Sequence, residues 1–178
     1  MRGIVVRRNE EALAVIDGEA VAALTEAATA ATFYVPGLTP TQIEANRRIP
    51  PLAAQVYRQA GTSGAQHLAI AFRDDRPLGF VIATRHGPGD HELDWLMVHP
   101  DAHGSGLSAM LMREGMGWLG TEAPMWLTVL RHNDRAIAFY RRFGFEIDRA
   151  AVLDRPVPSW IMRRPPGPLP PEQEAHAE

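Results

Sequence analysis

The segment Leu96–Ser108 restricts the fold of this chain more than any other stretch of its sequence. It reads LMVHPDAHGSGLS, in which a strand-like run ends at Val98, a proline turns the chain, and Gly104 and Gly106 precede a helical pattern. The two glycines allow backbone N–H groups to turn toward a common centre, and the following helix adds the positive end of its dipole. The segment therefore predicts a strand–turn–helix unit that suits a pyrophosphate, with a plain turn as the alternative.

Two better-known glycine motifs do not fit this segment. The dinucleotide-binding fingerprint needs a third glycine, which is missing here. The nucleophile elbow of hydrolases needs glycines two residues on either side of the serine, whereas the glycines around Ser105 are adjacent to it. Neither of these two kinds of site is predicted.

A second motif follows about thirty residues later, at residues 133–145, which read NDRAIAFYRRFGF. It predicts a helix that starts at Asn133 and ends before Gly144. Asn133 can cap this helix, and Tyr140 lies two turns further along the same face. A ligand along that face would contact both side chains, whereas the phenylalanines of the motif are expected in the core.

The remaining periodicity predicts a mixed α/β sheet of about seven strands with four or so helices on both faces. Strand-like runs are expected at residues 4–8, 67–72, 78–84, 92–98, 125–130, 145–150 and 159–163. Helical runs are expected at residues 19–31, 41–48, 52–59, 104–119 and 133–143, with Pro50-Pro51 as a break between the second and the third. Gly115 and Gly117 would each cost about 1 kcal/mol against alanine in a helix, so they are expected to permit close packing against the sheet.

The charge balance argues against two classes of partner. The chain has 178 residues and a formal net charge of −3, from 18 cations, all of them arginine, and 21 acids. Three of the acids lie in the last seven residues, so residues 1–164 carry 18 charges of each sign. A balanced body lacks the general field that favours duplex nucleic acid or an anionic membrane, so neither is expected as a partner.

Residues 1–164 are expected to form one domain, followed by an acidic tail at residues 165–178. The tail contains five prolines and few bulky apolar side chains, which predicts an extended, disordered segment. The absence of cysteine excludes disulfides, thiolate nucleophiles and cysteine–zinc sites together. No secretory signal and no apolar run of roughly 20 residues is visible, so a cytoplasmic location is expected.

Together, the two motifs resemble the acetyl-CoA-binding motifs of the GNAT superfamily of N-acetyltransferases. The first is similar to its R/Q-x-x-G-x-G/A pattern and the second to its N-x-x-A-x-x-F-Y-x-x-x-G-F pattern. The resemblance covers nearly the whole chain except the tail and implies an acyl-CoA N-acyltransferase fold. His103 occupies the usual Arg/Gln position and Ser108 the final Gly/Ala. Because His103 is largely neutral near pH 7, it is expected to weaken cofactor binding without abolishing it.

The resemblance implies a role for each part of the two motifs, with acetyl-CoA as cosubstrate. Main-chain groups at the end of the fourth strand would pair with the pantetheine arm as an added strand does, namely those of Leu96, Met97 and Val98. Backbone N–H groups beside His103 would hold the pyrophosphate, namely those of Gly104, Ser105, Gly106, Leu107, Ser108 and Ala109. Asn133 would hydrogen-bond the pantetheine or adenosine side, and Tyr140 would protonate the departing CoA thiolate.

Two carboxylates are candidates for the general base that takes the proton of an attacking amine. Glu92 lies where the histone-type lysine acetyltransferases of the superfamily carry a catalytic Glu, and Asp94 lies on the same strand face. A branch that modifies protein N-termini uses a Glu on the fifth strand instead, where this chain has Thr128. The alternative for Glu92 and Asp94 is a solvated strand face, but together with Asp90 they would attract a cationic amine.

Other polar residues carry weaker signals. Five histidines lack the spacing of metal ligands and are expected on the surface, so no metal site is predicted: His86, His91, His99, His103 and His132. Arg47 and Arg48 lie where the resemblance places the acceptor pocket, and Tyr34 and Pro36 are further candidates to line it. Trp95 is a candidate too, although burial is the expectation for this side chain.

The expected function is direct acetyl transfer from acetyl-CoA to an amine in a ternary complex, without an acyl-enzyme. The acceptor is expected to be a small-molecule amine or an amine of a peptide or protein, and charged tRNA is disfavoured by the neutral body. A non-catalytic acyl-CoA-binding sensor is the alternative, which Tyr140 argues against because a binder needs no proton donor beside the sulfur. Dimers are common among proteins similar to this chain, which leaves a homodimer as an open expectation.

Overall fold

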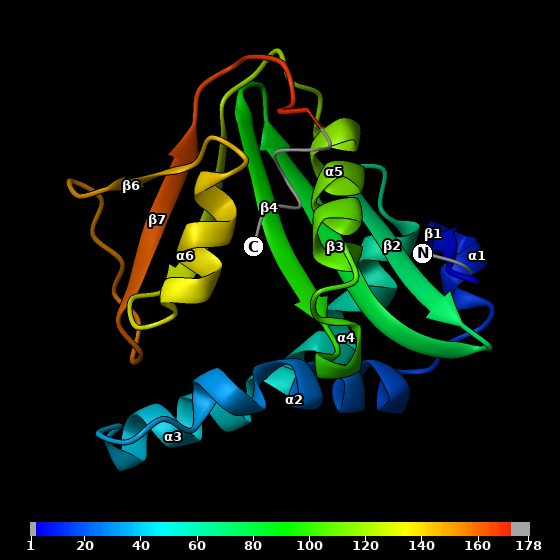
Figure 1. Cartoon of the computed structure of the whole chain (residues 1–178), viewed down its shortest axis with the longest axis horizontal. Coiled ribbons are helices and arrows are strands. Elements are labelled where there is room, and N and C mark those ends of the chain that lie inside the picture. Colours follow the sequence, from blue (N-terminus) through cyan, green and yellow to red (C-terminus); the bar gives the residue numbers. More distant parts are fainter. Residues whose placement is uncertain (1–2, 172–178) are drawn as a thin grey trace.

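A computed structural model of the chain describes residues 3–171, which form one seven-stranded sheet flanked by helices (Figure 1). The strands, in the spatial order β1-β2-β3-β4-β5-β7-β6, are β1 Val5–Arg8, β2 Gln66–Arg73, β3 Arg76–Gly87, β4 Asp90–Val98, β5 Met125–Leu130, β6 Glu146–Asp148 and β7 Ser159–Arg164. The helices are α1 Asn9–Leu13, α2 Gly18–Phe33, α3 Pro40–Arg47, α4 Ile49–Thr62, α5 Leu107–Leu119 and α6 Asp134–Arg141, with a 3-10 turn η1 at Pro100–Ala102. The predicted mixed sheet is confirmed.

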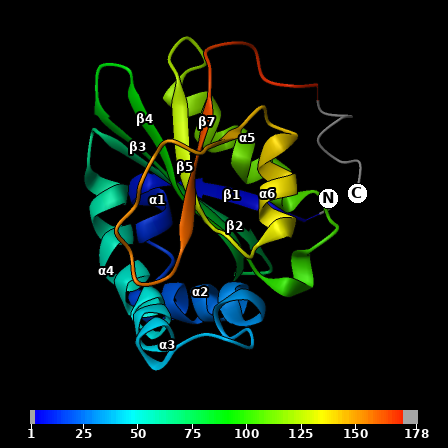
Figure 2. The same ribbon diagram turned by 90° about the vertical axis from the view of Figure 1, so that its left-hand side faces the viewer.

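Helices cover both faces of the sheet (Figure 2). α5 and α6 pack over one face, where Phe143 belongs to a buried apolar cluster. α1, α2 and α4 pack over the other face, where Tyr57 belongs to a second cluster. Neighbouring residues of β3 divide between the two, because Val81 faces the first cluster and Phe80 and Ile82 face the second.

The sheet opens between β4 and β5, its only parallel pair among the described residues. These strands pair at His91 with Met125 and at Glu92 with Trp126, and then separate. β4 continues to pair with β3 on its other side and carries one extra residue at Asp94, a β-bulge that bends the strand. In Figure 1, β4 and β7 diverge toward the bottom of the view. The edge of β4 that faces β5 is therefore unpaired beyond Glu92.

Helix starts follow local rules, with two differences from expectation. Asp17 caps α2, accepting a hydrogen bond from the Ala20 N–H at 2.8 Å, as an aspartate before a helical run is expected to do. The predicted break between the second and third helices is present at Arg48, but Pro50 and Pro51 lie in the first turn of α4, where an N–H would have no helical acceptor. The short helix α1 was not predicted. Within residues 3–171, no helix is both long and apolar enough to cross a membrane.

Gly115 allows α5 to approach the sheet closely, as predicted. A Cβ at this position would lie 2.8 Å from Leu93 Cδ1 and 2.9 Å from Val81 Cγ2, which is closer than side-chain atoms pack. A Cβ at Gly117 would meet no atom within 4 Å, so close packing does not explain that glycine.

Residues 167–170, which belong to the predicted tail, contact the domain. The Arg164 guanidinium donates to the carbonyl of Gly167 at 2.7 Å, and Arg113 donates to the carbonyl of Pro170 at 2.5 Å. Two arginine side chains thus bind a proline-rich backbone that composition alone assigned to disorder. Residues 172–178 lie outside the described residues, and the prediction stands there untested.

Candidate active site

The turn before α5 has the conformation that its glycines were expected to supply. Gly104 and Gly106 have φ angles of 73° and 81°, in the left-handed region that favours glycine. The N–H groups of Ser108 and Ala109 lie in the first turn of α5 and have no intrahelical acceptor, so they are free for an anion. The N–H of Ser105 differs, because it donates to the Ala102 carbonyl at 3.3 Å.

His103 does not itself supply a cation beside this turn. Its Nδ1 lies 3.3 Å from Nη1 of Arg135, which donates to it, and the ring also hydrogen-bonds the backbone of Val98. Burial and the nearby Arg135 charge lower the pKa of His103, so the ring is neutral. Arg135, at the start of α6, therefore brings the positive charge that the Arg/Gln position of the motif lacks. Sequence reasoning missed Arg135, although it lies inside the second motif.

The main chain of Leu96, Met97 and Val98 belongs to the unpaired edge of β4. Leu96 and Val98 contribute side chains to the cluster under α5, whereas Met97 packs against the cluster on the opposite face. Their side chains thus anchor the strand on both sides and leave its β5-facing main chain available to an extended ligand.

Asn133 and Tyr140 frame α6 in the manner predicted. Asn133 caps the helix, since its Oδ1 accepts from the Ala136 N–H at 3.1 Å. The Tyr140 ring packs edge-on against Phe139 and Phe145, with centroids 5.5 and 6.4 Å away. Burial raises the pKa of Tyr140 to about 12, so the phenol holds its proton at neutral pH. Its hydroxyl makes no hydrogen bond to any residue between 3 and 171.

The two candidate bases lie close together at the narrow end of the opening. Glu92 is buried, at 7% exposure, and its Oε2 lies 2.7 Å from Nε2 of His86. Burial raises the pKa of Glu92, and the bond to His86 opposes that rise. The Asp94 side chain is exposed on one side. Desolvation by the surrounding protein, and to a smaller extent the charge of Glu92, raise the pKa of Asp94 to about 6. The solvated strand face is therefore not what the structure shows for Glu92.

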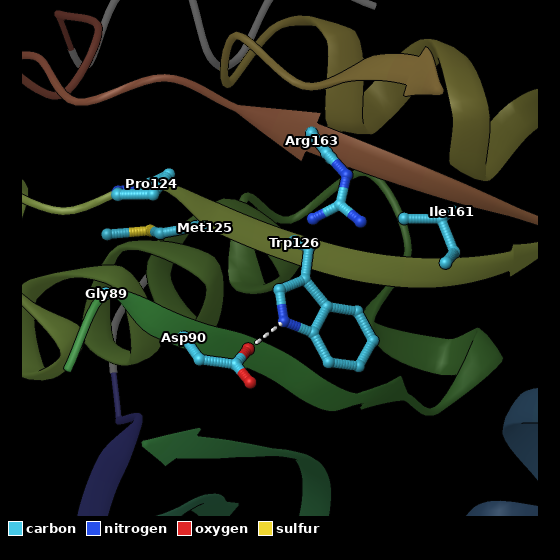
Figure 3. Close-up of a pocket in the computed structure, with 7 residues that line it drawn as sticks. All are labelled: Gly89, Asp90, Pro124, Met125, Trp126, Ile161 and Arg163. Carbon is cyan, nitrogen blue, oxygen red and sulfur yellow. Dashed lines mark hydrogen bonds between the residues drawn. The ribbon is translucent and has the colours of Figure 1, made fainter. Parts of the chain in front are cut away.

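Aromatic and acidic side chains extend this site along β5. The His86 ring stacks on Trp126 with centroids 5.9 Å apart, and Trp126 Nε1 donates to Asp90 Oδ1 at 2.7 Å (Figure 3). Asp90 and Trp126 line a pocket of about 420 Å³ together with Gly89, Pro124, Met125, Ile161 and Arg163. His86 lies on the surface, as expected, with its side chain 42% exposed, but it also contacts Glu92, which the sequence did not indicate.

Arg155 is a further residue that sequence reasoning missed. It lies in the segment between β6 and β7, where its charge lowers the pKa of both Glu92 and Asp94. Its Nη1 lies 3.5 Å from the Thr128 hydroxyl on β5. No short-range pattern links Arg155 to β4, so only the folded arrangement reveals it.

The other expected acceptor-side residues divide into three groups. Arg48 lines a second pocket of about 390 Å³ between α3 and Pro156, and it pairs with Glu44 at 3.4 Å. Trp95 is half-buried and stacks on Phe80 with centroids 6.4 Å apart, so it packs with the core as expected. Arg47, Tyr34 and Pro36 are exposed and line neither pocket.

Two of the remaining histidines have structural partners, whereas the buried Nδ1 of His91 has no hydrogen-bond partner among residues 3–171. His99 accepts from the Asp101 N–H at 3.2 Å, and His132 Nε2 lies 2.8 Å from the Thr32 carbonyl. Between residues 3 and 171, no group of three or more histidine or acidic side chains is arranged to hold a metal ion.

Comparisons with known proteins point in the same direction. The sequence profile of the acetyltransferase (GNAT) family matches residues 32–145. The peptidyl-lysine N-acetyltransferase YjaB of Salmonella typhimurium is 34% identical over 89 residues, which are 49% of this chain and 55% of that protein. An uncharacterized N-acetyltransferase of Mycobacterium bovis, Mb2688, is 29% identical over 99 residues, which are 54% of this chain and 64% of that protein. The chain thus spans between half and two thirds of the length of these relatives.

The fold comparison covers nearly the whole chain. The crystal structure of the PaiA N-acetyltransferase from Thermoplasma acidophilum in complex with coenzyme A superposes with a TM-score of 0.69. The match covers 91% of this chain and 98% of that one at 17% sequence identity. At this identity the likeness establishes a shared fold, and the acyl-CoA N-acyltransferase architecture is confirmed.

Proposed function

The chain belongs to the acetyltransferase (GNAT) family, and from this premise we propose that it transfers the acetyl group of acetyl-CoA directly to an amine in a ternary complex. One observation carries the proposal: the opening between β4 and β5. Glu92 lies at its narrow end, and β4 leads from its wide end to the turn with Gly104 and Gly106. A cofactor-binding turn and a candidate base are thereby joined by one unpaired strand edge.

The residues of the opening fit acetyl-CoA. The unpaired edge of β4 can pair with the amides of the pantetheine arm as it would with another strand. The free N–H groups of Ser108 and Ala109 and the Arg135 guanidinium supply donors and positive charge for the pyrophosphate. When bound, acetyl-CoA would supply the acetyl group as an activated thioester.

The chain's own side chains would move two protons. Glu92 or Asp94 would accept the proton of the amine, directly or through water, as the amine nitrogen bonds the acetyl carbon. The carbon–sulfur bond breaks with its electron pair on sulfur, and Tyr140 would donate its hydroxyl proton there. Burial raises the pKa of Tyr140 to about 12, so the phenol is protonated at neutral pH and would give up its proton only as negative charge develops on the sulfur.

The pKa of Asp94 suits a base at neutral pH. At about 6 it leaves the carboxylate ionised above that pH yet more basic than an ordinary aspartate. Glu92 is closer to the narrow end and is oriented by His86 at 2.7 Å. Glu92 and Asp94 are therefore both candidates for the general base, and substituting each one alone would show which of them accepts the proton.

A second candidate function is a non-catalytic acyl-CoA sensor. It would need the cofactor turn but neither the protonated Tyr140 nor the paired carboxylates, so the site favours the enzyme. The Salmonella relative is named for peptidyl-lysine, which makes a lysine-containing peptide one of the acceptors to test.

The experiment that tests the proposal follows release of free thiol from acetyl-CoA. The acceptor panel contains polyamines, aminoglycosides, amino acids, peptide N-termini and lysine peptides, and turnover with at least one class is expected. If CoA stabilises the purified protein against heat but no amine releases thiol, the sensor replaces the enzyme.

The Tyr140→Phe variant tests the acid. It is expected to lower kcat by roughly 10- to 100-fold with little change in the affinity for acetyl-CoA, because only the proton donor is removed. Tyr57→Phe is the control, since it removes a buried hydroxyl on the other face of the sheet. An unchanged kcat in Tyr140→Phe would remove Tyr140 from the acid role.

A further inference from the structure

Arg155 occupies a fixed place beside the candidate bases. The two residues that follow it anchor the segment: the Pro156 carbonyl accepts from Gln42 Nε2 of α3 at 3.2 Å, and Val157 is buried. Arg155 itself is exposed and reaches the Thr128 hydroxyl on β5. The backbone is held in place while the guanidinium faces the opening.

The guanidinium of Arg155 keeps most of its donors free. Within residues 3–171 its single hydrogen bond is the 3.5 Å contact to Thr128, and it forms no ion pair. Two arginines on or beside β7 are occupied by contrast. Arg163 pairs with Asp148 at 2.8 Å, and Arg131 stacks on Trp160 at 3.9 Å. Arg155 is thus a positioned cation that forms no ion pair with the acids of the described part of the chain.

The acceptor side of the opening therefore presents both signs of charge. Glu92 and Asp94 attract the cationic form of an amine, whereas Arg155 acts on the same space with a positive charge. A simple amine or diamine would meet attraction and repulsion together. An amine that also carries a carboxylate would satisfy both groups, because a guanidinium binds a carboxylate through two parallel N–H donors.

We propose that Arg155 is a specificity-determining residue that binds the carboxylate of the acceptor, and that the acceptor is a small amino acid. This inference rests on the proposed acetyl transfer, for which it names the substrate class. The amine of the acceptor faces Glu92 and Asp94, and its carboxylate faces Arg155. Acceptors with a free amine and no carboxylate are poor substrates.

The experiment compares each amino acid with its own carboxamide, which has the same shape but no negative charge. The probes are α-amino acids, β-alanine and 4-aminobutanoate, each beside its amide, with thiol release as the readout. Rates are compared per free amine, because conversion to the amide lowers the pKa of a nearby ammonium group. The wild-type protein is expected to prefer at least one acid over its amide by about 10- to 100-fold in kcat/KM.

Variants of Arg155 locate the preference. Arg155→Met is expected to remove the preference by lowering kcat/KM for the acid alone, and Arg155→Lys to keep part of it, since a lysine supplies charge without the planar fork. Arg149→Met is the matched control. Arg149 is an exposed arginine of the same segment and does not act on either carboxylate.

Each outcome decides between the inference and the proposed function. If acid and amide react equally in the wild-type protein, or fall equally in Arg155→Met, the inference is overturned while acetyl transfer stands. If no amine reacts, the proposed function fails, and the carboxylate site at Arg155 is then tested by binding of the amino acids to the protein. In the presence of CoA, thermal stabilisation by an acid but not by its amide, lost in Arg155→Met, supports the carboxylate site. Equal or absent stabilisation overturns it.

Discussion

Two clusters in this molecule share a histidine, a glutamate and a tryptophan in nearly the same geometry. In each, a histidine Nε2 contacts a glutamate, at 2.9 Å in one and 2.7 Å in the other, and stacks on a tryptophan with centroids 5.4 and 5.9 Å apart. The His67 cluster lies where β1 and β2 meet α5 and consists of His67, Glu114, Trp118 and Arg8. The His86 cluster lies at the opening between β4 and β5 and consists of His86, Glu92, Trp126 and Asp90.

The pKa values of the two glutamates are shifted in opposite directions. Arg8 binds both carboxylate oxygens of Glu114, at 2.7 and 2.8 Å, and this contact lowers the pKa of Glu114. Among residues 3–171 no arginine is bonded to Glu92, and burial raises the pKa of Glu92. Glu114, neutralised by the Arg8 guanidinium, ties α5 to β1 and β2. Glu92, which is desolvated and lies near Asp90, is instead a candidate to accept a proton. The contrast shows that residue type and distance alone do not identify a catalytic carboxylate.

The largest expected effect comes from removing the unneutralised carboxylates. The double variant Glu92→Gln/Asp94→Asn should lower kcat/KM by roughly 10²- to 10⁴-fold, because no base remains to take the proton of the amine. Steady-state thiol release measures the loss, and acetyl-CoA binding by calorimetry should be unchanged. Glu114→Gln is the matched control, and an equal loss of activity there would erase the distinction between the clusters.

The free energy of unfolding should fall more in Glu114→Gln than in Glu92→Gln, which is the reverse of the order expected for activity. Glu114→Gln should lower the free energy of unfolding by about 1–3 kcal/mol, because Arg8 and the buried His67 lose a charged partner. Urea unfolding followed by tryptophan fluorescence measures the change. Glu92→Gln should leave stability unchanged or slightly raised, because the variant no longer buries an ionised carboxylate without an arginine. A larger loss in Glu92→Gln would make the His86 cluster structural.

The pH dependence should separate the clusters by sign. Because the pKa of Glu114 is lowered, its stabilising contribution is complete above the unfolded value of 4.5 and is lost as the pH falls through the folded pKa. Because the pKa of Asp94 is raised to about 6 from 3.8, its ionised form destabilises the fold above pH 6, and this cost disappears as the pH falls toward 4.

Kinetics and unfolding test these signs together. The kcat/KM of the wild-type protein should rise with pH along a limb near 6, and Glu114→Gln should show the same limb. Asp94→Asn should gain stability at pH 8 but not at pH 4. A limb that moves in Glu114→Gln would contradict the assignment of the titrating group to the opening.

The smallest effect is expected for the histidines themselves. His86→Asn should lower kcat/KM only a few-fold and shift the limb near pH 6 upward, because His86 favours the charged form of Asp94 as well as that of Glu92. His67→Asn should leave the pH profile unchanged. Parallel pH profiles of the two variants give the comparison, and identical shifts would argue for a general loss of stability in both.

Features that depend on nearby residues were predictable from the sequence. The left-handed glycines before α5, the Asn133 cap and the Asp17 cap each follow from residues within a few positions of one another. The strand runs were predictable for the same reason. Pro50 and Pro51 were misread because a proline pair both ends one helix and fits the first turn of the next.

Contacts that depend on the path of the chain were not predictable. Trp126 reaches Asp90 only because a parallel crossover through α5 brings β5 beside β4. His86 meets Glu92 through the register of a hairpin that contains a bulge, which no periodicity specifies. Arg155 depends on the segment that returns from β6 to β7, so composition could identify it only as one exposed arginine among many.

The two-residue contact between β4 and β5 makes Glu92 a pivot. Any rotation of the half-sheet β5–β7 against the half-sheet β1–β4 turns about the pairs at His91 and Glu92, so displacement grows with distance from them. Val98 lies six residues further along β4, a lever arm of roughly 20 Å at about 3.3 Å per residue. The wide end of the opening can therefore widen or narrow around a long ligand, while Glu92 at the narrow end scarcely moves. The same two-residue contact between β4 and β5 thus allows the cofactor end of the opening to adjust and keeps the position of Glu92 fixed.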